Sequence, residues 1–272
     1  MFLDRHMPRY APALPIDVFV DFDGTIAPDD PTDSLFARFA DPSWMEIEAE
    51  WQQGRITSRE TMARQVELIR ATPEDIAAFL AEMRIDPGFP AFVALCRRHG
   101  VRITVVSDGM DLLVETMLKA AGLDLAIYAN HLVWQGDDRW ALRFPYMRSD
   151  CRMGMGNCKC SHARFMGIGA NVMVGDGRSD YCIAERCDLV LAKGKLAAHC
   201  RDKGVQHVTF SSFAEASKRA AESPCHRYTK ATPVGGVLRA HAPPEYSLRD
   251  LISSGAHAHD GVRSAVFGRE LP

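Results

Sequence analysis

Residues 16–25 read Ile-Asp-Val-Phe-Val-Asp-Phe-Asp-Gly-Thr, and this stretch decides the fold that the sequence predicts. Its first five residues form a largely apolar run that is typical of a buried β-strand. Two carboxylates, Asp21 and Asp23, follow this run, and Gly24 then allows the chain to turn. Open α/β sheets bind their ligands at the carboxyl ends of their strands. The stretch therefore predicts a strand that carries two acids at the ligand-binding edge of a sheet.

The rest of the chain supplies partners for that strand, because short β-rich runs alternate with helical patterns. The expected strands are residues 16–22, 101–107, 125–130, 171–175, 188–192 and 205–210, and the expected helices are residues 90–99, 110–121, 161–167, 179–185, 195–203 and 213–222. Residues 130–144 carry the turn signal Gln135-Gly136-Asp137-Asp138 and predict a β-hairpin. We therefore expect an α/β fold with a Rossmann-like, doubly wound parallel sheet.

Residues 28–87 interrupt the alternation, because they hold amphipathic helical patterns and no strand-like run. Helix-start signals such as Thr57-Ser58 and Thr72-Pro73 punctuate this segment. We expect it to form a helical cap inserted after the first strand, with residues 1–27 and 88–222 forming the core. Beyond residue 222 the periodicity fades, so residues 223–272 are expected to be an extension of low order.

The composition is that of an ordinary soluble globular protein, with 47% hydrophobic and 25% charged residues among 272. A formal net charge of -3 argues against a nucleic-acid partner. Residues 1–15 have the pattern of neither a signal peptide nor a membrane span. We therefore expect a cytoplasmic protein, a monomer or homodimer with no membrane partner, in which the eight cysteines are reduced thiols.

Further polar groups follow other predicted strands. Ser107-Asp108-Gly109 closes one strand, and its hydroxyl and backbone N–H groups suit a phosphate. Asp176 and Asp180 flank a turn after another strand, where carboxylates suit Mg²⁺. Lys159, which lies in sequence between Gly109 and Asp176, could offset the repulsion between a carboxylate and a phosphate dianion. Each signal also has a plain structural explanation, as a turn, a helix cap or a solvated lysine.

The order of these groups resembles the four motifs of the haloacid dehalogenase-like (HAD) hydrolase superfamily. Those motifs are a strand ending Asp-x-Asp-Gly-Thr, a strand ending in Ser, a Lys, and a strand ending Gly-Asp-x-x-x-Asp. The sequence from about residue 17 to 213 is most like the phosphoserine-phosphatase-like branch (subfamily IB), and within it the 2-hydroxy-3-keto-5-methylthiopentenyl-1-phosphate phosphatases. The stretches that carry this resemblance are Asp86-Pro87-Gly88-Phe89, Val106-Ser107-Asp108-Gly109-Met110-Asp111, Tyr128-Ala129-Asn130, Cys151 with Gly156-Asn157-Cys158-Lys159, and Asp188-Leu189-Val190-Leu191-Ala192.

The resemblance implies a Mg²⁺-dependent phosphoric monoester hydrolase that acts on a small phosphorylated metabolite through an aspartyl-phosphate. Asp21 would be the nucleophile, and Asp23 would protonate the leaving alcohol and later activate water. Lys159 would also be catalytic. The presence of Asp23 favours phosphate esters over halides, because a departing halide needs no proton.

The same resemblance implies binding roles for the later motifs. The phosphoryl group would be bound by Ser107, Asp108, Gly109 and Lys159. The metal would be held by Asp21, the backbone carbonyl of Asp23, Asp176 and, through water, Asp180. Alternatively, Asp180 would pair with Lys159.

The substrate stays open, because the chain departs from the nearest branch at three points. Asp108 stands where glycine is usual, Cys160 stands where a proline commonly follows the lysine, and the C-terminal extension is long. The candidate substrates are therefore the methylthiopentenyl phosphate, phosphoserine, phosphocholine or phosphoethanolamine, and sugar phosphates. A phosphotransferase of the same fold is a further alternative.

A cluster of soft ligand types surrounds the lysine, formed by Cys151, Cys158, Cys160 and His162. The spacing is not that of a zinc finger, because a single residue separates Cys158 from Cys160. One interpretation is that reduced thiols pack the segment that presents Lys159. The other is a Zn²⁺ site, and with it a non-catalytic, metal- or redox-sensing binding protein.

Overall fold

The computed structural model of the protein describes residues 15–222, 224–225 and 246–247, so most of the expected extension at 223–272 lies outside the described residues. The elements up to the hairpin are β1 (Ile16–Val20), α1 (Pro31–Phe39), α2 (Trp44–Gln52), α3 (Ser58–Val66), α4 (Pro73–Glu82), α5 (Phe89–Arg98), β2 (Arg102–Met110), α6 (Asp111–Ala120), β3 (Ala126–Gly136) and β4 (Arg139–Arg143). Those that follow are α7 (Lys159–Met166), β5 (Ala170–Gly175), η1 (Arg178–Asp180), α8 (Tyr181–Ala184), β6 (Leu189–Ala192), α9 (Gly194–Lys203), β7 (His207–Thr209), α10 (Phe213–Glu222), β8 (Pro224–Cys225) and β9 (Tyr246–Ser247).

Within the described residues, seven strands form one sheet in the order β4-β3-β2-β1-β5-β6-β7. Neighbouring strands are parallel except for β3 and β4 at one edge, which are antiparallel. The expected α/β fold is confirmed. Because β1 lies between β2 and β5, the residues that follow it lie beside the ends of two other strands.

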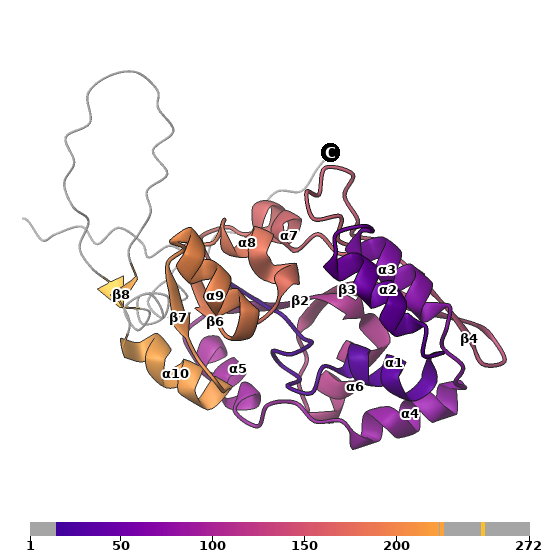
Figure 1. Ribbon diagram of the computed structural model, residues 1–272. Coiled ribbons are helices and arrows are strands. Elements are labelled where there is room, and N and C mark those ends of the chain that lie inside the picture. Colours follow the sequence, from indigo (N-terminus) through magenta and orange to yellow (C-terminus); the bar gives the residue numbers. More distant parts are fainter. Residues whose placement is uncertain (1–14, 223, 226–245, 248–272) are drawn as a thin grey trace, which may run out of the picture.

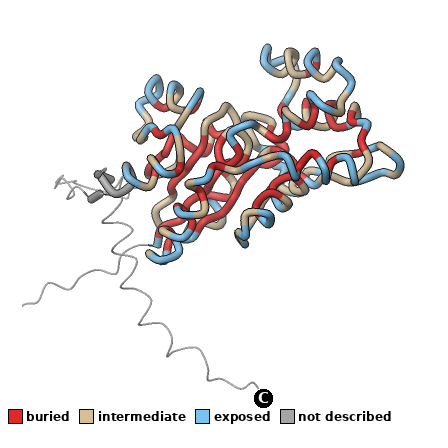
Figure 2. Tube along the Cα trace, turned by 90° about the horizontal axis from the view of Figure 1, so that it is seen from below, coloured by how far each residue is buried: buried red, intermediate tan, exposed pale blue. Residues whose placement is uncertain are grey.

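Helices cover both faces of the sheet (Figure 1), and the residues of its strands are mostly buried (Figure 2). Ile16, Val18 and Val20 of β1 pack into one hydrophobic cluster, together with α5, α6 and α10. Phe19 packs into a second cluster on the other face, together with α7, α8 and α9. Successive side chains of a strand point to opposite faces, so a strand covered on both sides is apolar at nearly every position. This explains the composition of residues 16–20.

Five helices lie between β1 and β2, and the first four, α1 to α4, fall where the sequence predicts a helical insertion. Their starts follow the capping signals, since Thr57 accepts a hydrogen bond from the backbone N–H of Glu60, and Thr72 and Asp75 form a capping box. Buried residues of the insertion, such as Phe36, belong to the same hydrophobic cluster as β1. The insertion therefore packs directly against the core of the sheet, and the cap boundaries at 28 and 87 stay predictions.

The expected hairpin is formed by β3 and β4, although β3 is longer than predicted and runs without a break from the parallel sheet into the hairpin. Trp140 Nε1 of β4 donates a hydrogen bond to Ala71 O at 2.8 Å. The backbone N–H of Ala71 in turn donates to Asp138 O at 3.2 Å. The hairpin thus joins the edge of the sheet to the helical insertion.

Two element boundaries near the sheet edge differ from the prediction. β2 continues through Ser107 to Met110, where a glycine turn was expected, and its pairing with β3 shifts register between Val106 and Met110. Such a bulge re-aims side chains without ending the strand. α7 begins at Lys159, earlier than predicted, so this lysine lies in the first turn of a helix.

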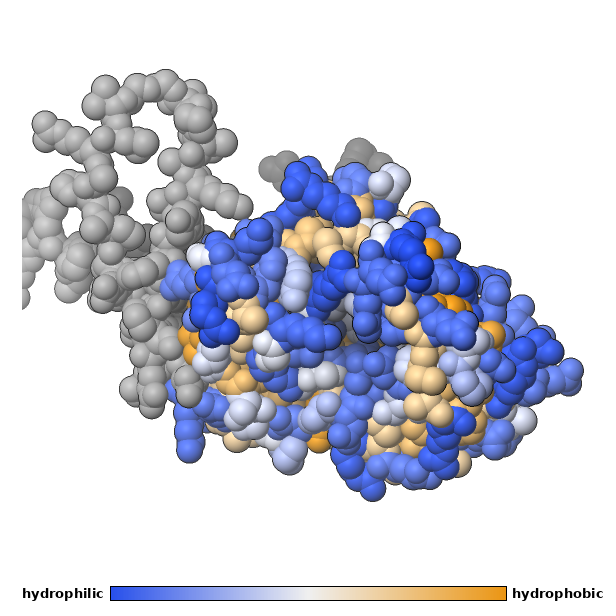
Figure 3. Space-filling view, viewed as in Figure 1, coloured by the Kyte–Doolittle hydropathy of each residue, from blue (hydrophilic) through white to orange (hydrophobic). Residues whose placement is uncertain are grey.

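Every helix among the described residues falls short of the length and hydrophobicity that crossing a bilayer requires. The face of the molecule drawn in Figure 3 is mostly hydrophilic, with small apolar patches between charged side chains. The cytoplasmic location and the oligomeric state expected from the sequence stay predictions.

Candidate active site

The polar residues predicted for the site come together at the carboxyl ends of three neighbouring strands. Asp21 follows β1, Ser107 lies near the end of β2, and Asp176 follows β5. The backbone N–H of Asp21 still donates to Val174 O, at 2.9 Å, so the sheet fixes the position of Asp21. The chain leaves the sheet only after this residue.

Asp21 and Asp180 share one ammonium partner. Lys159 Nζ lies 2.6 Å from Asp21 Oδ1 and 2.7 Å from Asp180 Oδ1. The side chains of all three residues are buried, with exposed fractions of 1%, 6% and 0% for Lys159, Asp21 and Asp180. Burial alone would lower the pKa of Lys159, but the carboxylates of Asp180 and Asp21 outweigh it and raise that pKa above its ordinary value. The lysine therefore carries a positive charge.

Asp23 has a different set of partners from Asp21. Its Oδ2 accepts a hydrogen bond from Ser107 Oγ at 3.0 Å, and its Oδ1 accepts one from the backbone N–H of Thr32 at 3.2 Å. Thr32 lies in the first turn of α1, so the start of the insertion helps to orient this carboxylate. Asp23 is half-buried, whereas Asp21 is buried. The two acids thus have separate surroundings although one residue separates them.

Asp21, Asp176 and Asp180 form a candidate metal site, since each offers a carboxylate oxygen within 4.8 Å of the others. Burial raises the pKa of Asp176, and burial together with repulsion from Asp180 raises the pKa of Asp21 well above its ordinary value. These three carboxylates outnumber the lysines near them, Lys159 and Lys193, which leaves negative charge in excess. Hard carboxylate oxygens are the ligands that Mg²⁺ prefers. This donor set therefore fits Mg²⁺.

Hydrogen bonds from the protein fix the orientation of two of these carboxylates. Thr25 Oγ1 donates to Asp176 Oδ1 at 2.7 Å. Asp180 Oδ2 accepts from the backbone N–H groups of Asp176 at 3.1 Å and Gly177 at 3.2 Å. Such contacts set the direction of a metal ligand before the metal binds. The sequence left two roles open for Asp180, a contact with the metal through water or a pair with Lys159. In this structure Asp180 pairs with Lys159.

The residues after Ser107 are themselves held by the protein. Asp108 accepts hydrogen bonds from Ser58 Oγ at 2.6 Å and from the backbone N–H of Asn157 at 2.7 Å. The backbone N–H of Gly109 donates to Ser107 Oγ at 2.8 Å. Because Ser58 begins α3, the carboxylate of Asp108 joins the helical insertion to the end of β2.

Some residues at the site were not assigned a role from the sequence. Asn157 Nδ2 donates to Ser107 O at 2.8 Å and to Tyr128 O at 2.7 Å, and so fixes the end of β2 beside β3. Asn157 and Thr25 lie within stretches that the resemblance already marked, which was the available signal. Thr32 lies at the start of the insertion, where the chain leaves the core beside Asp21, and this position was the available signal. Ser58 comes from farther along the insertion, where no sequence signal pointed to the site.

The cysteine and histidine cluster lies at the start of α7, but its members do not surround a common point. His162 Nε2 lies 2.6 Å from Asn157 Oδ1, and its ring packs against Tyr128 with 4.7 Å between ring centroids. Burial lowers the pKa of His162 to about 4. Across the described part of the chain, only the three aspartates bring three potential ligand atoms within 4.8 Å of one another. His162 therefore supports Asn157 in this structure.

The family model of the haloacid dehalogenase-like hydrolases matches residues 18–185. A curated relative from Exiguobacterium sp., a 2-hydroxy-3-keto-5-methylthiopentenyl-1-phosphate phosphatase, is 31% identical over 74% of this chain and 94% of its own. The phosphatase of the same name from Brevibacillus brevis is 30% identical over 72% of this chain and 90% of its own.

Among solved structures, the fold is similar to that of a phosphoserine phosphatase described as a phospho-aspartyl intermediate analogue. The TM-score is 0.58, with 20% sequence identity over 75% of this chain and 98% of the other. At this level of identity the similarity concerns the fold.

Proposed function

Because this chain belongs to the haloacid dehalogenase-like hydrolase family, we propose that it is a Mg²⁺-dependent phosphatase that forms an aspartyl-phosphate on Asp21. The observation that carries the proposal is that the two acids, Asp21 and Asp23, have different partners. Asp21 lies among the metal-site carboxylates and Lys159, whereas Asp23 lies between Ser107 and the start of α1. A nucleophile and a proton donor need different surroundings of this kind.

Asp21 is suited to attack phosphorus. The contacts to Lys159 Nζ and to the backbone N–H of Phe22 both use Oδ1, so we assign Oδ2 as the attacking oxygen. The strand holds the backbone of Asp21 in place, which keeps the direction of attack constant. Attack would form the Oδ2–P bond and break the bond between phosphorus and the ester oxygen.

Asp23 is suited to proton transfer. In its protonated form it would donate to the departing ester oxygen, and the resulting carboxylate would then accept a proton from the water that hydrolyses the aspartyl-phosphate. In this structure Ser107 Oγ and the Thr32 N–H hold its two oxygens, and the Thr32 N–H can keep the carboxyl group in place when the Ser107 hydroxyl turns to the phosphoryl group. One pocket can therefore serve both displacements.

The phosphoryl oxygens would be bound by Ser107, the backbone N–H groups of Asp108 and Gly109, and Lys159. Mg²⁺ would be held by Asp21, Asp176 and the backbone carbonyl of Asp23, with Asp180 acting through water. When bound, the cation would supply positive charge that lets a carboxylate approach a phosphate dianion. Lys159 would add to that charge, because its pKa is raised.

For the substrate, we propose a small phosphomonoester, with 2-hydroxy-3-keto-5-methylthiopentenyl 1-phosphate as the first candidate. Support comes from the relatives of that name, which are about one-third identical over most of their length. Phosphoserine and phosphocholine are the next candidates.

A phosphate-release screen with and without Mg²⁺ tests this proposal. Purified protein would be offered the three candidate esters and sugar phosphates, beside Asp21→Asn and the exposed-carboxylate control Asp29→Asn. We expect Mg²⁺-dependent release by the wild type and Asp29→Asn, and loss of at least about a thousandfold in Asp21→Asn. If no ester is hydrolysed with Mg²⁺ present, the proposal is wrong. Transfer of phosphate to an added alcohol in preference to water would identify a phosphotransferase.

A further inference from the structure

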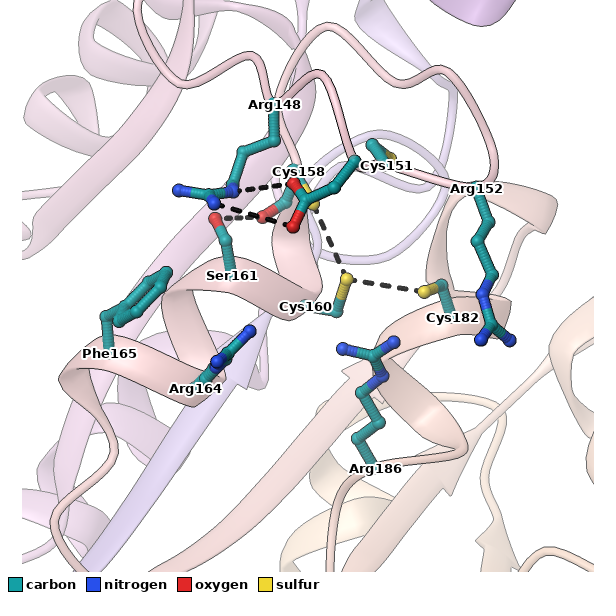
Figure 4. A pocket seen from close by; sticks show the side chains of 11 residues that line it. Arg148, Cys151, Arg152, Cys158, Cys160, Ser161, Arg164, Phe165, Cys182 and Arg186 are labelled. Atoms are coloured by element: carbon teal, nitrogen blue, oxygen red, sulfur yellow. Dashed lines mark hydrogen bonds and ion pairs between the residues drawn. The ribbon is translucent and has the colours of Figure 1, made fainter.

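Three thiols lie in a row beside the helix that presents Lys159 (Figure 4). Cys158 precedes α7, Cys160 lies in its first turn, and Cys182 lies on α8. Cys160 Sγ is 3.4 Å from Cys158 Sγ and 3.3 Å from Cys182 Sγ. Cys160 is thus in contact with both of the others, and all three are free thiols.

The arrangement suits disulfide chemistry better than metal binding. A tetrahedral or trigonal metal site needs several sulfurs around one centre. Within the described residues, the only three potential ligands that lie within 4.8 Å of one another are the aspartates of the active site, so the three sulfurs form a row. Neighbouring sulfurs in contact need only a small approach to form an S–S bond.

These thiols line a pocket of about 220 Å³ beside α7, and neither Lys159 nor an active-site carboxylate is among its lining residues. Four arginines also line it: Arg148, Arg152, Arg164 and Arg186. The acidic residue that lines it, Asp150, pairs with Arg148 at 2.9 Å. The pocket wall therefore carries an excess of positive charge, which favours an anionic ligand.

Cys158 has the character of a nucleophile. The hydrogen bond between the Cys160 and Cys158 thiols outweighs the effect of burial and lowers the pKa of Cys158 to about 5, and the backbone N–H of Ser161 adds to this. Burial instead raises the pKa of Cys96, a buried cysteine of α5, to about 12. The thiolate is the reactive form of cysteine in exchange with disulfides. Cys96 is therefore a natural control.

We propose that Cys158, Cys160 and Cys182 form a thiol–disulfide exchange site that reacts with an anionic, low-molecular-weight disulfide. The Cys158 thiolate attacks one sulfur of the small disulfide, which forms a mixed disulfide and releases the other half as a thiolate. Cys160 loses its proton and attacks Cys158 Sγ, which forms a protein disulfide and releases the second half. Cys182 can then attack Cys160 Sγ, which moves the disulfide to Cys160–Cys182 and frees Cys158.

The overall reaction is balanced between protein and ligand. Two protein thiols lose two protons and two electrons, and the small disulfide gains both and leaves as two thiols. Lys159 lies between Cys158 and Cys160 in sequence, so disulfide formation would alter the backbone that presents its ammonium to Asp21 and Asp180. This last consequence rests on the proposed function, whereas the exchange reaction does not.

The exchange reaction can be followed by mass spectrometry after incubation with glutathione disulfide, without measuring phosphatase activity. In the wild type we expect an intramolecular disulfide that includes Cys160, with Cys96 unmodified. Because Cys151 also interacts with Cys158, we expect a mixed disulfide trapped on Cys158 in Cys151→Ser/Cys160→Ser, and separately in Cys151→Ala/Cys160→Ala. Circular dichroism and thermal melting would show that the variants are folded. A mixed disulfide on another cysteine, or no modification in the folded proteins, would overturn the proposal.

The charge of the pocket can be tested with two disulfides of different charge. The double variant Arg152→Gln/Arg186→Gln should slow the reaction with glutathione disulfide by about fivefold or more, because attraction of the anion is reduced. The rate with the uncharged bis(2-hydroxyethyl) disulfide should change by less than about twofold. Arg143→Gln, an exposed site on β4, serves as the control and should change neither rate. Equal slowing of both reactions, or of neither, would contradict the preference for an anion.

Discussion

Thr25 Oγ1 donates a 2.7 Å hydrogen bond to Asp176 Oδ1, and this contact joins the segment after β1 to the segment after β5. Both strands end at the site, and the carboxylates that follow them repel one another, since repulsion from Asp176 adds to burial in raising the pKa of Asp21. A neutral hydroxyl that donates to Asp176 holds this carboxylate without adding charge. Thr25 is itself fully buried, at 0% exposed, so the bond is shielded from water.

Thr25→Val should weaken activation by Mg²⁺, because Asp176 loses the partner that orients it. Changes beside a metal ligand typically reduce metal affinity by about 10- to 100-fold, and we expect the Mg²⁺ concentration for half-maximal activity to rise by about tenfold. Thr25→Ser keeps the hydroxyl and should remain within about threefold of the wild type. Titration of phosphatase activity with Mg²⁺ checks both. An equal change in the two variants would mean that the methyl group matters more than the hydrogen bond.

Gly24→Ala should affect the same carboxylate by a different route. Gly24 has a φ of +68°, and a Cβ at this position would lie 2.7 Å from Asp176 Oδ2. Gly54 is a matched control, since its φ is +73° and its Cβ would have nothing within 4 Å. Both alanine variants should lose about 1–2 kcal/mol of stability from the left-handed backbone. Only Gly24→Ala should lose kcat/KM, by about tenfold or more. Similar losses of kcat/KM in both would contradict the contact with Asp176.

Asp23→Asn should separate the two halves of the reaction. With p-nitrophenyl phosphate, whose leaving group needs little protonation, we expect a burst of nitrophenolate followed by slow turnover, because the variant cannot activate water efficiently. With an alkyl phosphate the first step itself should slow by about 10²- to 10⁴-fold, so no burst is expected. Rapid-mixing kinetics beside Asp29→Asn as the control measures this. A burst with both esters would show that Asp23 is not the proton donor.

Ser58→Ala should loosen the insertion from the core. Ser58 Oγ donates a hydrogen bond to the carboxylate of Asp108. Without it, this partly buried carboxylate would keep fewer hydrogen-bond donors. We expect the free energy of unfolding to fall by about 1–2 kcal/mol in chemical denaturation. Ser34→Ala removes a more exposed hydroxyl that donates to Asp29 O, and should change stability by less than about 0.5 kcal/mol. Equal losses in the two variants would show that the Ser58–Asp108 bond adds no particular stability.

His162 should make stability depend on pH. Its pKa in the folded protein, lowered by burial to about 4, lies below the ordinary value of 6.5. Between these values the unfolded chain binds the proton and the folded protein does not, so stability falls as the pH is lowered from about 6.5 to 4. Between pH 7 and pH 4 we expect the free energy of unfolding to fall in the wild type, and to fall by about 2–3 kcal/mol less in His162→Gln. His131→Gln, at an exposed histidine, is the control. Denaturation curves at several pH values measure this, and parallel losses in all three proteins would contradict it.

Most of the sheet could be predicted from the sequence, because its strands are covered on both faces and are therefore apolar at nearly every position. Residues 16–20 show this, since β1 has side chains in both hydrophobic clusters. The extension of β2 past Ser107 could not be predicted, because Asp108 and Gly109 are typical turn residues. Pairing with β3 overrides that local preference through a bulge.

The site was predictable where it depends on strand ends. Asp21, Ser107 and Asp176 follow neighbouring strands, and parallel pairing brings them together. Contacts from the insertion were not predictable, because the sequence does not say which helix ends face the core. Ser58 is an example. The row of sulfurs was also hidden, since Cys182 reaches Cys160 only through the packing of α8 against α7.

The hairpin of β3 and β4 is a structural feature that can affect the turnover rate, because it is hydrogen-bonded to the insertion. Trp140 is 6% exposed, and with Asp138 it ties the edge of the sheet to Ala71 between α3 and α4. If the insertion swung open as a rigid lid, both hydrogen bonds would break and the indole would meet water. Lid motions limit turnover in many enzymes. The hairpin carries no proposed catalytic side chain, but by holding the insertion against the sheet it would affect the rate of product release.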